Sequence, residues 1–105
     1  MNNRIVVFNA DGNYIRQFGS FGIENCQFNH PRGVTVSLSN YIYVADSDNG
    51  RIQKFDINGN FISSISGLNE IPQGVLFGQL DTDINGNVYV ADLNNNMVYE
   101  LTPDM

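Results

Sequence analysis

The sequence is poor in basic residues and in charge generally. Its 105 residues include five Lys and Arg against eleven Asp and Glu, which gives a formal net charge of -6. Nucleic-acid binding normally needs a basic surface that displaces counterions, so this balance argues against a nucleic-acid partner. An anionic membrane surface would repel the chain for the same reason. The remaining partner classes are proteins, small molecules and cations.

Cysteine and long apolar runs are also scarce. The single cysteine, Cys26, excludes an internal disulfide and is compatible with a reducing compartment. No apolar run approaches the roughly 20 residues of a membrane-spanning helix. The run near the N-terminus is too short for a signal peptide. These absences favour the cytoplasm but leave the compartment unassigned.

The apolar residues that are present fall into short runs separated by turn residues. Asparagine and glycine fill the gaps, and both residue types suit tight turns. Long 3.6-residue periodicity is absent, so no helix is expected. The expected strands are residues 4–8, 14–18, 33–37, 41–46, 51–56, 61–66, 80–83, 87–92 and 97–101.

The runs repeat along the chain. Residues 41–46 (YIYVAD) match 87–92 (NVYVAD) at a displacement of 46, and residues 4–8 (RIVVF) match the strand that begins at Arg51 at a displacement of 47. With four strands named a to d, the order is c-d, a-b-c-d, a-b-c. The predicted units are 1–18 (c-d), 33–66 (a complete unit) and 79–105 (a-b-c).

Strand a of the third unit has two possible positions. Residues 72–75 (PQGV) resemble 31–34 (PRGV), but a displacement of 41 would require an insertion of five residues. The alternative is a strand at 80–83, directly before the turn at 83–86. We favour this second position because the Asp-Ile-Asn-Gly sequence supplies the turn.

A unit of four antiparallel strands every 46 to 47 residues has the size of one β-propeller blade. Runs such as YIYVA are apolar at successive positions, as expected for a sheet that packs on a neighbour at each face. A β-sandwich would not require near-identical units at a fixed spacing. The predicted fold is therefore all-β, with about two and a quarter four-stranded antiparallel blades of a propeller and no helix.

The central unit resembles the NHL repeat in three segments: Phe28-x-x-Pro31-x-Gly33-Val34, residues 41–46, and Asn49-x-Arg51-Ile52-Gln53-x-Phe55-Asp56-x-x-Gly59. The third unit departs from the pattern, with Met97 in place of Arg and Leu101 in place of Phe. The resemblance implies a propeller, commonly with six blades, that serves as a scaffold for proteins, RNA or small ligands. The structural positions of the repeat in this chain are Pro31, Gly33, Asp46, Arg51, Phe55, Gly59 and Asp92.

One segment resembles a calcium-binding loop. Asp81, Asp83 and Asn85 alternate before Gly86, and Asp92 stands at the twelfth position. Oxygen ligands at such a spacing can surround a hard cation. However, residues 88–91 read as a strand, which would carry Asp92 away from the turn. We therefore expect an Asp/Asn turn rather than a cation site, and no cofactor.

Two other groups could carry chemistry. Asp46 and Asp92 each end strand b, and they could form a paired-carboxylate site. The repeat spacing favours a structural role instead, in which Asp46 accepts backbone N–H groups of the next turn and pairs with Arg51. His30 has no nucleophile or carboxylate nearby in sequence, and Cys26 has no basic neighbour that would lower its pKa. No catalytic residue is predicted.

The sequence thus predicts a non-enzymatic propeller segment that serves as a scaffold for protein binding or self-assembly, as part of a larger ring. The alternative is a fragment of a lyase- or hydrolase-like propeller that binds a small ligand or metal in its channel. A six-bladed ring needs roughly 280 residues. The missing blades come from a longer chain or from further copies. Because strand c occurs at both ends, copies would leave one strand surplus, which favours the longer chain.

Overall fold

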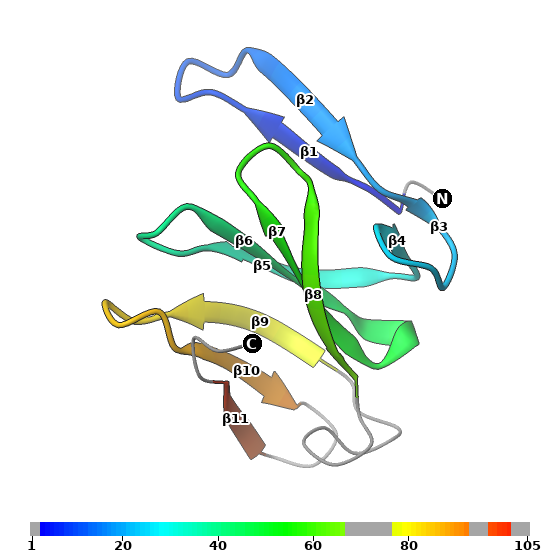
Figure 1. The fold of residues 1–105 in the computed structure, drawn as a ribbon, viewed down its shortest axis with the longest axis vertical. Helices are drawn as coiled ribbons and strands as arrows, with labels where there is room; N and C mark the ends of the chain where they lie inside the picture. The colour runs from blue at the N-terminus through cyan, green and yellow to red at the C-terminus, as the bar shows by residue number, and fades with distance from the viewer. Residues whose placement is uncertain (1–2, 67–76, 93–96, 102–105) are drawn as a thin grey trace.

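The computed structural model describes residues 3–66, 77–92 and 97–101. Within these ranges the chain is almost entirely strand, without an α-helix (Figure 1). No described helix is long and apolar enough to cross a membrane. The strands are β1 (Ile5–Phe8), β2 (Tyr14–Phe18), β3 (Ser20–Phe21), β4 (Gln27–Phe28), β5 (Pro31–Val36), β6 (Tyr41–Asp46), β7 (Arg51–Asp56), β8 (Phe61–Ser66), β9 (Phe77–Thr82), β10 (Val88–Asp92) and β11 (Met97–Leu101).

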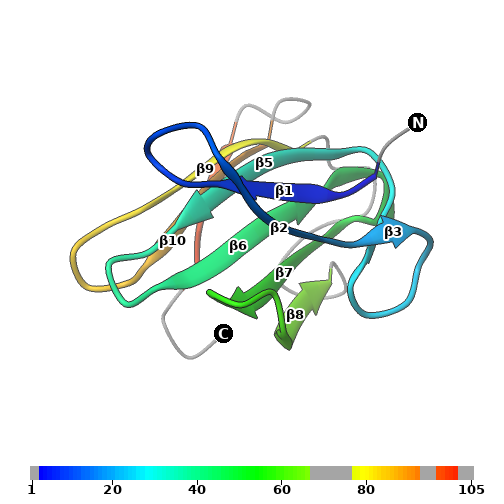
Figure 2. The same ribbon diagram turned by 90° about the horizontal axis from the view of Figure 1, so that it is seen from above.

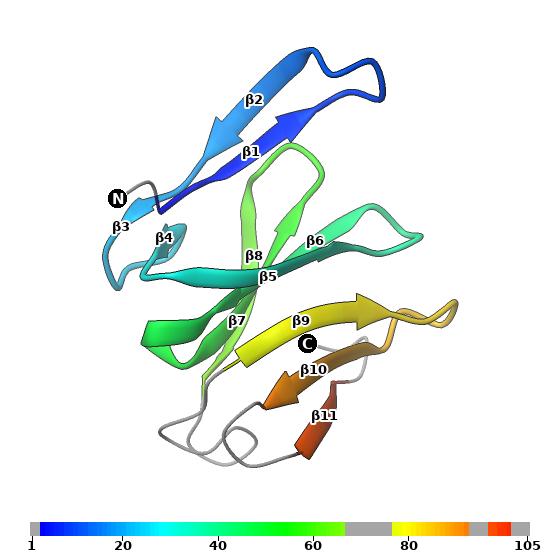
Figure 3. The same cartoon turned by 180° about the vertical axis from the view of Figure 1, so that it is seen from behind.

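The long strands form three stacked sheets (Figures 1 and 3). The central sheet is an antiparallel meander in the order β5-β6-β7-β8, which confirms the predicted four-stranded unit. The hairpin β1-β2 lies on one side of it, and the sheet β9-β10-β11 on the other. Figure 2 shows the hairpin crossing over the central sheet. We call these the first, central and third sheets.

Both faces of the central sheet pack on a neighbouring sheet, as the apolar runs predicted. On one face, Ile42, Val44 and Phe55 form a buried cluster with Phe28, and side chains of β1 and β2 pack against it. The opposite face packs on the third sheet through a second cluster. That cluster contains Tyr43, Ala45, Ile52, Leu80, Val88, Val90 and Leu101.

The three hairpin turns at residues 9–13, 56–60 and 83–87 use the same device. In each, an oxygen of the first side chain accepts hydrogen bonds from the third and fifth backbone N–H groups, at 2.9–3.0 Å. The fourth residue is a glycine with φ of 85°, 90° and 86°, a conformation that other residues adopt at a cost. The last two turns share the sequence DINGN. This pentapeptide therefore forms the same tight hairpin turn at both of its positions in this chain.

The structure differs from the sequence-based expectation in the start of β5, which lies at Pro31 rather than at residue 33, and in three further places. The turn after β6 is a single turn of 3-10 helix, η1 (Ser47–Asn49), which ends at Gly50 with φ 63°. The predicted loop after β2 contains β3 and β4, which form a two-residue parallel pair. β9 begins at residue 77 rather than 80. It stands 46 residues after β5, which confirms the favoured position; residues 72–75 lie outside the described ranges.

Gly33 brings two strands of neighbouring sheets into close approach. A Cβ atom at this position would lie 2.6 Å from the carbonyl oxygen of Gly78 and 3.2 Å from the backbone nitrogen of Leu80. Both neighbours are backbone atoms of β9, so neither can rotate away. The glycine therefore sets the spacing between β5 and β9.

Replacing Gly33 by alanine should force β5 and β9 apart and lower the free energy of unfolding by about 1–3 kcal/mol, the usual range for overpacking. Urea unfolding monitored by circular dichroism measures this change. Arg32→Ala is the matched control, because this exposed neighbour lies in the same strand. Equal unfolding midpoints for the two variants would contradict the close approach.

Candidate functional site

A buried carboxylate lies at the end of the central sheet where β6 passes into β7. Asp46 is 0% exposed and stands opposite Arg51 in the strand register. Its Oδ2 accepts hydrogen bonds from Arg51 Nε at 2.7 Å, Asn49 Nδ2 at 3.0 Å and Gln53 Nε2 at 3.2 Å. Its Oδ1 accepts the backbone N–H of Asn29 at 2.7 Å. The ion pair predicted with Arg51 is present, whereas the backbone donor comes from the preceding loop.

The same network fixes the loop at residues 22–28. The terminal nitrogens of Arg51 donate to three backbone carbonyls of this loop, at 2.7–2.8 Å. Gln53 donates to the carbonyl of Gln27 at 2.7 Å and accepts the backbone N–H of Cys26 at 3.1 Å. A loop in which the two-residue strand β4 is the regular structure thus gains partners for its backbone groups.

Four donors occupy the Asp46 carboxylate, and it has no exposed surface. A general base or metal ligand needs a free lone pair and access to its substrate. Asp46 has neither, so its chemistry is structural: it orients Arg51, and Arg51 holds the loop. These hydrogen bonds therefore fix the position of the loop at residues 22–28 on the end of the central sheet.

Asp92 stands at the equivalent position of the third sheet but has different surroundings. It is 2% exposed and accepts a hydrogen bond from the Tyr99 hydroxyl at 2.9 Å. Burial, followed by this bond, raises the pKa of Tyr99. In the register Asp92 faces Met97, where Asp46 faces Arg51. The two carboxylates belong to different sheets and bind different partners, Arg51 for Asp46 and Tyr99 for Asp92, so no contact between them forms a paired site in the described residues.

His30 has a partner that sequence spacing did not show. Its Nδ1 lies 2.6 Å from Asp48 Oδ2 and 2.8 Å from Asn29 Oδ1, and its backbone N–H donates to Asn3 Oδ1 at 2.8 Å. The side chains of His30 and Asp48 are 41% and 43% exposed. His30 also has a φ of 52°, which is unusual for a residue other than glycine. The pair joins the loop before β5 to the 3-10 turn.

The remaining predicted positions lie in the framework. Pro31 begins β5 opposite Asp46. Phe55 is 0% exposed within the cluster beside the first sheet, and the free thiol of Cys26 is half-buried against that cluster. A Cβ atom on Gly59 would lie 2.8 Å from the Phe18 ring.

The segment that resembles a calcium loop forms a turn. The Asp83 carboxylate accepts the turn's backbone N–H groups, Asn87 Nδ2 at 2.9 Å and the Tyr89 hydroxyl at 3.0 Å. These bonds, led by that from the Asn87 side chain, lower the pKa of Asp83. Asp81 accepts the N–H of Thr82 at 2.8 Å. In the described ranges, no group of three or more His, Cys, Asp or Glu side chains could hold a metal ion.

Tyr89 gives a titration that tests this turn. The hydrogen bond to Asp83 is the largest of the causes that raise the pKa of Tyr89 from 10.0 to about 12. The hydrogen bond from the Tyr89 hydroxyl should stabilise the folded chain fully below pH 10, and this stabilisation should be lost as the pH rises towards 12 and the hydroxyl loses its proton. Ultraviolet absorbance of tyrosinate measures this titration. The native chain should show a transition near pH 12 that is missing from the Tyr89→Phe variant. Tyr14→Phe, which removes an exposed tyrosine, is the control. If the two variants lost the same transition from the absorbance curve, the hydrogen bond between Tyr89 and Asp83 would be contradicted.

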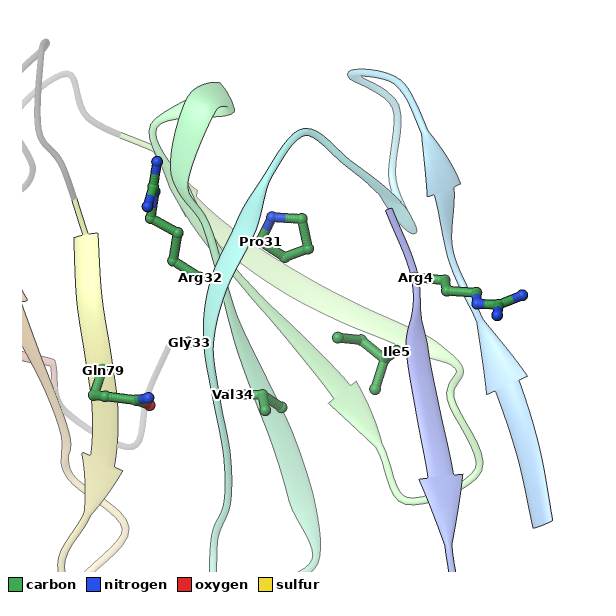
Figure 4. Close-up of a pocket in the computed structure, with 7 residues that line it drawn as sticks. All are labelled: Arg4, Ile5, Pro31, Arg32, Gly33, Val34 and Gln79. Carbon is green, nitrogen blue, oxygen red and sulfur yellow. The ribbon is translucent and has the colours of Figure 1, made fainter. Parts of the chain in front are cut away.

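One pocket, of about 160 Å³, lies between the first sheet and the start of β5 (Figure 4). Arg4 and Ile5 of the first sheet form one wall, and residues 31–34 form the other, with Gln79 of β9 beside them. In Figure 4 the Gln79 side chain points towards Gly33, while the Arg4 side chain points away from the pocket. The pocket thus borders the open side of β1.

Comparison with known proteins identifies the repeat family to which the central sheet is similar. Residues 28–55 match the family profile of the NHL repeat. The protein brain tumor of Drosophila melanogaster is 50% identical over 48 residues, which are 46% of this chain and 5% of that protein. The B-box type zinc finger protein ncl-1 of Caenorhabditis elegans is 48% identical over 48 residues, which are 46% of this chain and 6% of that protein.

A third similarity extends over more of the chain. Peptidyl-glycine alpha-amidating monooxygenase B of Xenopus laevis is 32% identical over 106 residues, which are 87% of this chain and 12% of that protein. The chain therefore spans between 5% and 12% of the length of these three relatives.

Proposed function

The chain contains an NHL repeat, and we propose that it is a propeller segment that serves as a non-enzymatic scaffold for protein binding or self-assembly. The observation that carries this proposal is the contrast between the sheets. The central sheet packs on a buried cluster at each of its two faces, whereas each outer sheet packs on one of these clusters and exposes apolar side chains such as Ile15 (44%) and Val98 (66%). Apolar sheet surfaces of this kind need further sheets to cover them.

The proposed division follows the strands. Residues 1–18 supply strands c-d of a first blade, 33–66 are a complete blade, and 79–105 supply strands a-b-c of a third. The partners are then proteins or further blades, from the rest of a longer chain or from copies of this one. We also propose that the segment works without a cofactor, because the carboxylates of Asp46 and Asp83 are engaged in internal hydrogen bonds. Calorimetric titration with Ca²⁺ tests this and should show no heat of binding.

Solution mass and apolar exposure test the scaffold proposal together. Light scattering should show either association, or a monomer that binds an apolar dye such as ANS because its outer sheets are uncovered. A stable monomer that binds no dye would overturn the proposal, since its outer sheets would then need no neighbours. Phe55→Ala, which disrupts the buried cluster beside the first sheet, provides a reference for the dye fluorescence of a less tightly packed chain.

A second candidate is a ligand-binding propeller enzyme. The similarity to the Xenopus amidating monooxygenase over 87% of the chain favours it, and so does the pocket lined by residues of β5 and β9. Under this proposal the completed ring would bind a small ligand at its centre, with polar groups such as Arg32 and Gln79 at the pocket wall. Elemental analysis of the purified protein separates the candidates, because a stoichiometric transition metal would favour the enzyme.

A further inference from the structure

The two ends of the chain carry complementary parts of one blade. β1 and β2 match β7 and β8 at a displacement of 47, so they have the character of third and fourth strands. Their packing agrees: Ile5 and Phe18 pack on the central sheet, as Ile52 and Ile65 at the equivalent positions pack on the third sheet. β9 and β10 match β5 and β6 at a displacement of 46, which makes them first and second strands.

The first sheet is open where its first and second strands would lie. β1 pairs with β2 alone among the described strands, and the pocket borders its other side. Phe8 is 57% exposed, whereas the equivalent Phe55 is 0% exposed. Val34 and Val36 of β5 are 47% and 51% exposed. Exposed apolar side chains thus lie on both sides of the position that two more strands would occupy.

The charges at the two ends are complementary as well. Arg4 is the equivalent of Arg51 and is exposed, without a hydrogen bond or ion pair to any described residue. In the third sheet, Asp92 occupies the position of Asp46, and β11 presents Met97 in its register where β7 presents Arg51. One end therefore has the arginine of the repeat, and the other has its aspartate.

We propose that β1 of one copy of this chain pairs with β10 of a second copy, so that Arg4 binds the partner's Asp92 as Arg51 binds Asp46. The mixed sheet takes β9 and β10 from one copy and β1 and β2 from the other. The proposal rests on the proposed function of the chain as a propeller segment. Because the contact is head-to-tail, it repeats from copy to copy and generates a closed ring or a filament.

β11 occupies the place that β1 would take, so the two strands compete for β10. Of the positions Arg51, Ile52 and Phe55 in β7, residues 4–8 at β1 retain all three identities and β11 retains none. Among the described strands, β11 also lies at an edge of its sheet, and its Val98 is 66% exposed. If β1 of a second copy replaces β11 beside β10, Arg4 and Phe8 stand where the central sheet has Arg51 and Phe55. β2 then adds a fourth strand to the sheet.

Cysteine cross-linking distinguishes the two pairings. In the exchanged sheet Tyr89 faces Val7, as Tyr43 faces Lys54, whereas within one copy Tyr89 faces Glu100. In a Cys26→Ser background, we expect Val7→Cys with Tyr89→Cys to form a disulfide between copies under mild oxidation. The matched pair Tyr89→Cys with Glu100→Cys reports the pairing within one copy, and it should cross-link less as the protein concentration rises.

Arg4→Met tests the charge pair itself, since it places at β1 the residue that β11 has. Truncating one partner of a buried charge pair should weaken self-association by about 30-fold or more. Arg16→Met is the control, because it removes the same charge from the same hairpin, where the guanidinium bonds the carbonyl of Ile57. Sedimentation velocity over a concentration series measures both variants.

The outcomes separate this inference from the proposed function. Association with a Val7–Tyr89 cross-link and a larger effect of Arg4→Met than of Arg16→Met supports the exchange. A monomer at all concentrations that binds an apolar dye overturns the exchange but leaves the propeller segment intact. A monomer without dye binding overturns both. Association that retains the Tyr89–Glu100 cross-link overturns the exchange alone.

Discussion

Replacing Asp46 by alanine is expected to lower the free energy of unfolding by about 3–5 kcal/mol, the range for removing one partner of a buried ion pair. The variant leaves Arg51, a residue that is 9% exposed in the native structure, without its counterion. It also removes the acceptor for Asn49, Gln53 and the backbone N–H of Asn29. Since small domains are stable by only about 5–15 kcal/mol, much of the chain should unfold.

Denaturant unfolding of three variants tests this expectation. Asp48→Ala is the control, because it breaks a half-exposed pair with His30 and should cost at most about 1 kcal/mol. The double variant Asp46→Ala with Arg51→Met removes both charges and should recover part of the loss. If Asp46→Ala were as mild as the control, the network would not hold the loop.

The strands were predictable because their signal is local. β6, β7 and β8 have the predicted bounds, since each is a short apolar run between turn residues. The order and stacking of the sheets followed from the repeat, because equal units at fixed spacing need equal neighbours. β9 was placed too late by three residues, because Phe77 and Gly78 lack the alternation that marks a strand.

The contacts at the end of the central sheet could not be predicted in the same way. His30 meets Asp48 and Asn3, and Arg51 reaches carbonyls 24–28 residues earlier in the chain. Such pairs depend on how the loop between β3 and β5 folds over the sheet, and no local sequence pattern indicates that path. The Asp46–Arg51 pair was predictable because two paired strands place both residues in one register.

Phe55→Ala should have a comparable effect on stability by a different mechanism. Phe55 is 0% exposed, and its ring lies 4.9 Å from that of Phe18, 5.8 Å from that of Phe28 and 6.1 Å from that of Phe61, measured between centroids. Truncation leaves a cavity among three rings, and we expect a loss of about 3–5 kcal/mol. Phe21→Ala, at a ring 65% exposed, should change the stability by less than about 0.5 kcal/mol.

Hydrogen exchange can locate the loss from Phe55→Ala. The three rings around Phe55 come from β2, β4 and β8, so the cluster joins the first sheet to the central one. Amide protection should therefore fall most in β1 and β2, whereas β9 and β10, which pack on the opposite face, should keep theirs. Uniform loss across all three sheets would contradict this separation. Selective loss would show that each face of the central sheet holds its neighbour through its own cluster, as a repeated architecture requires.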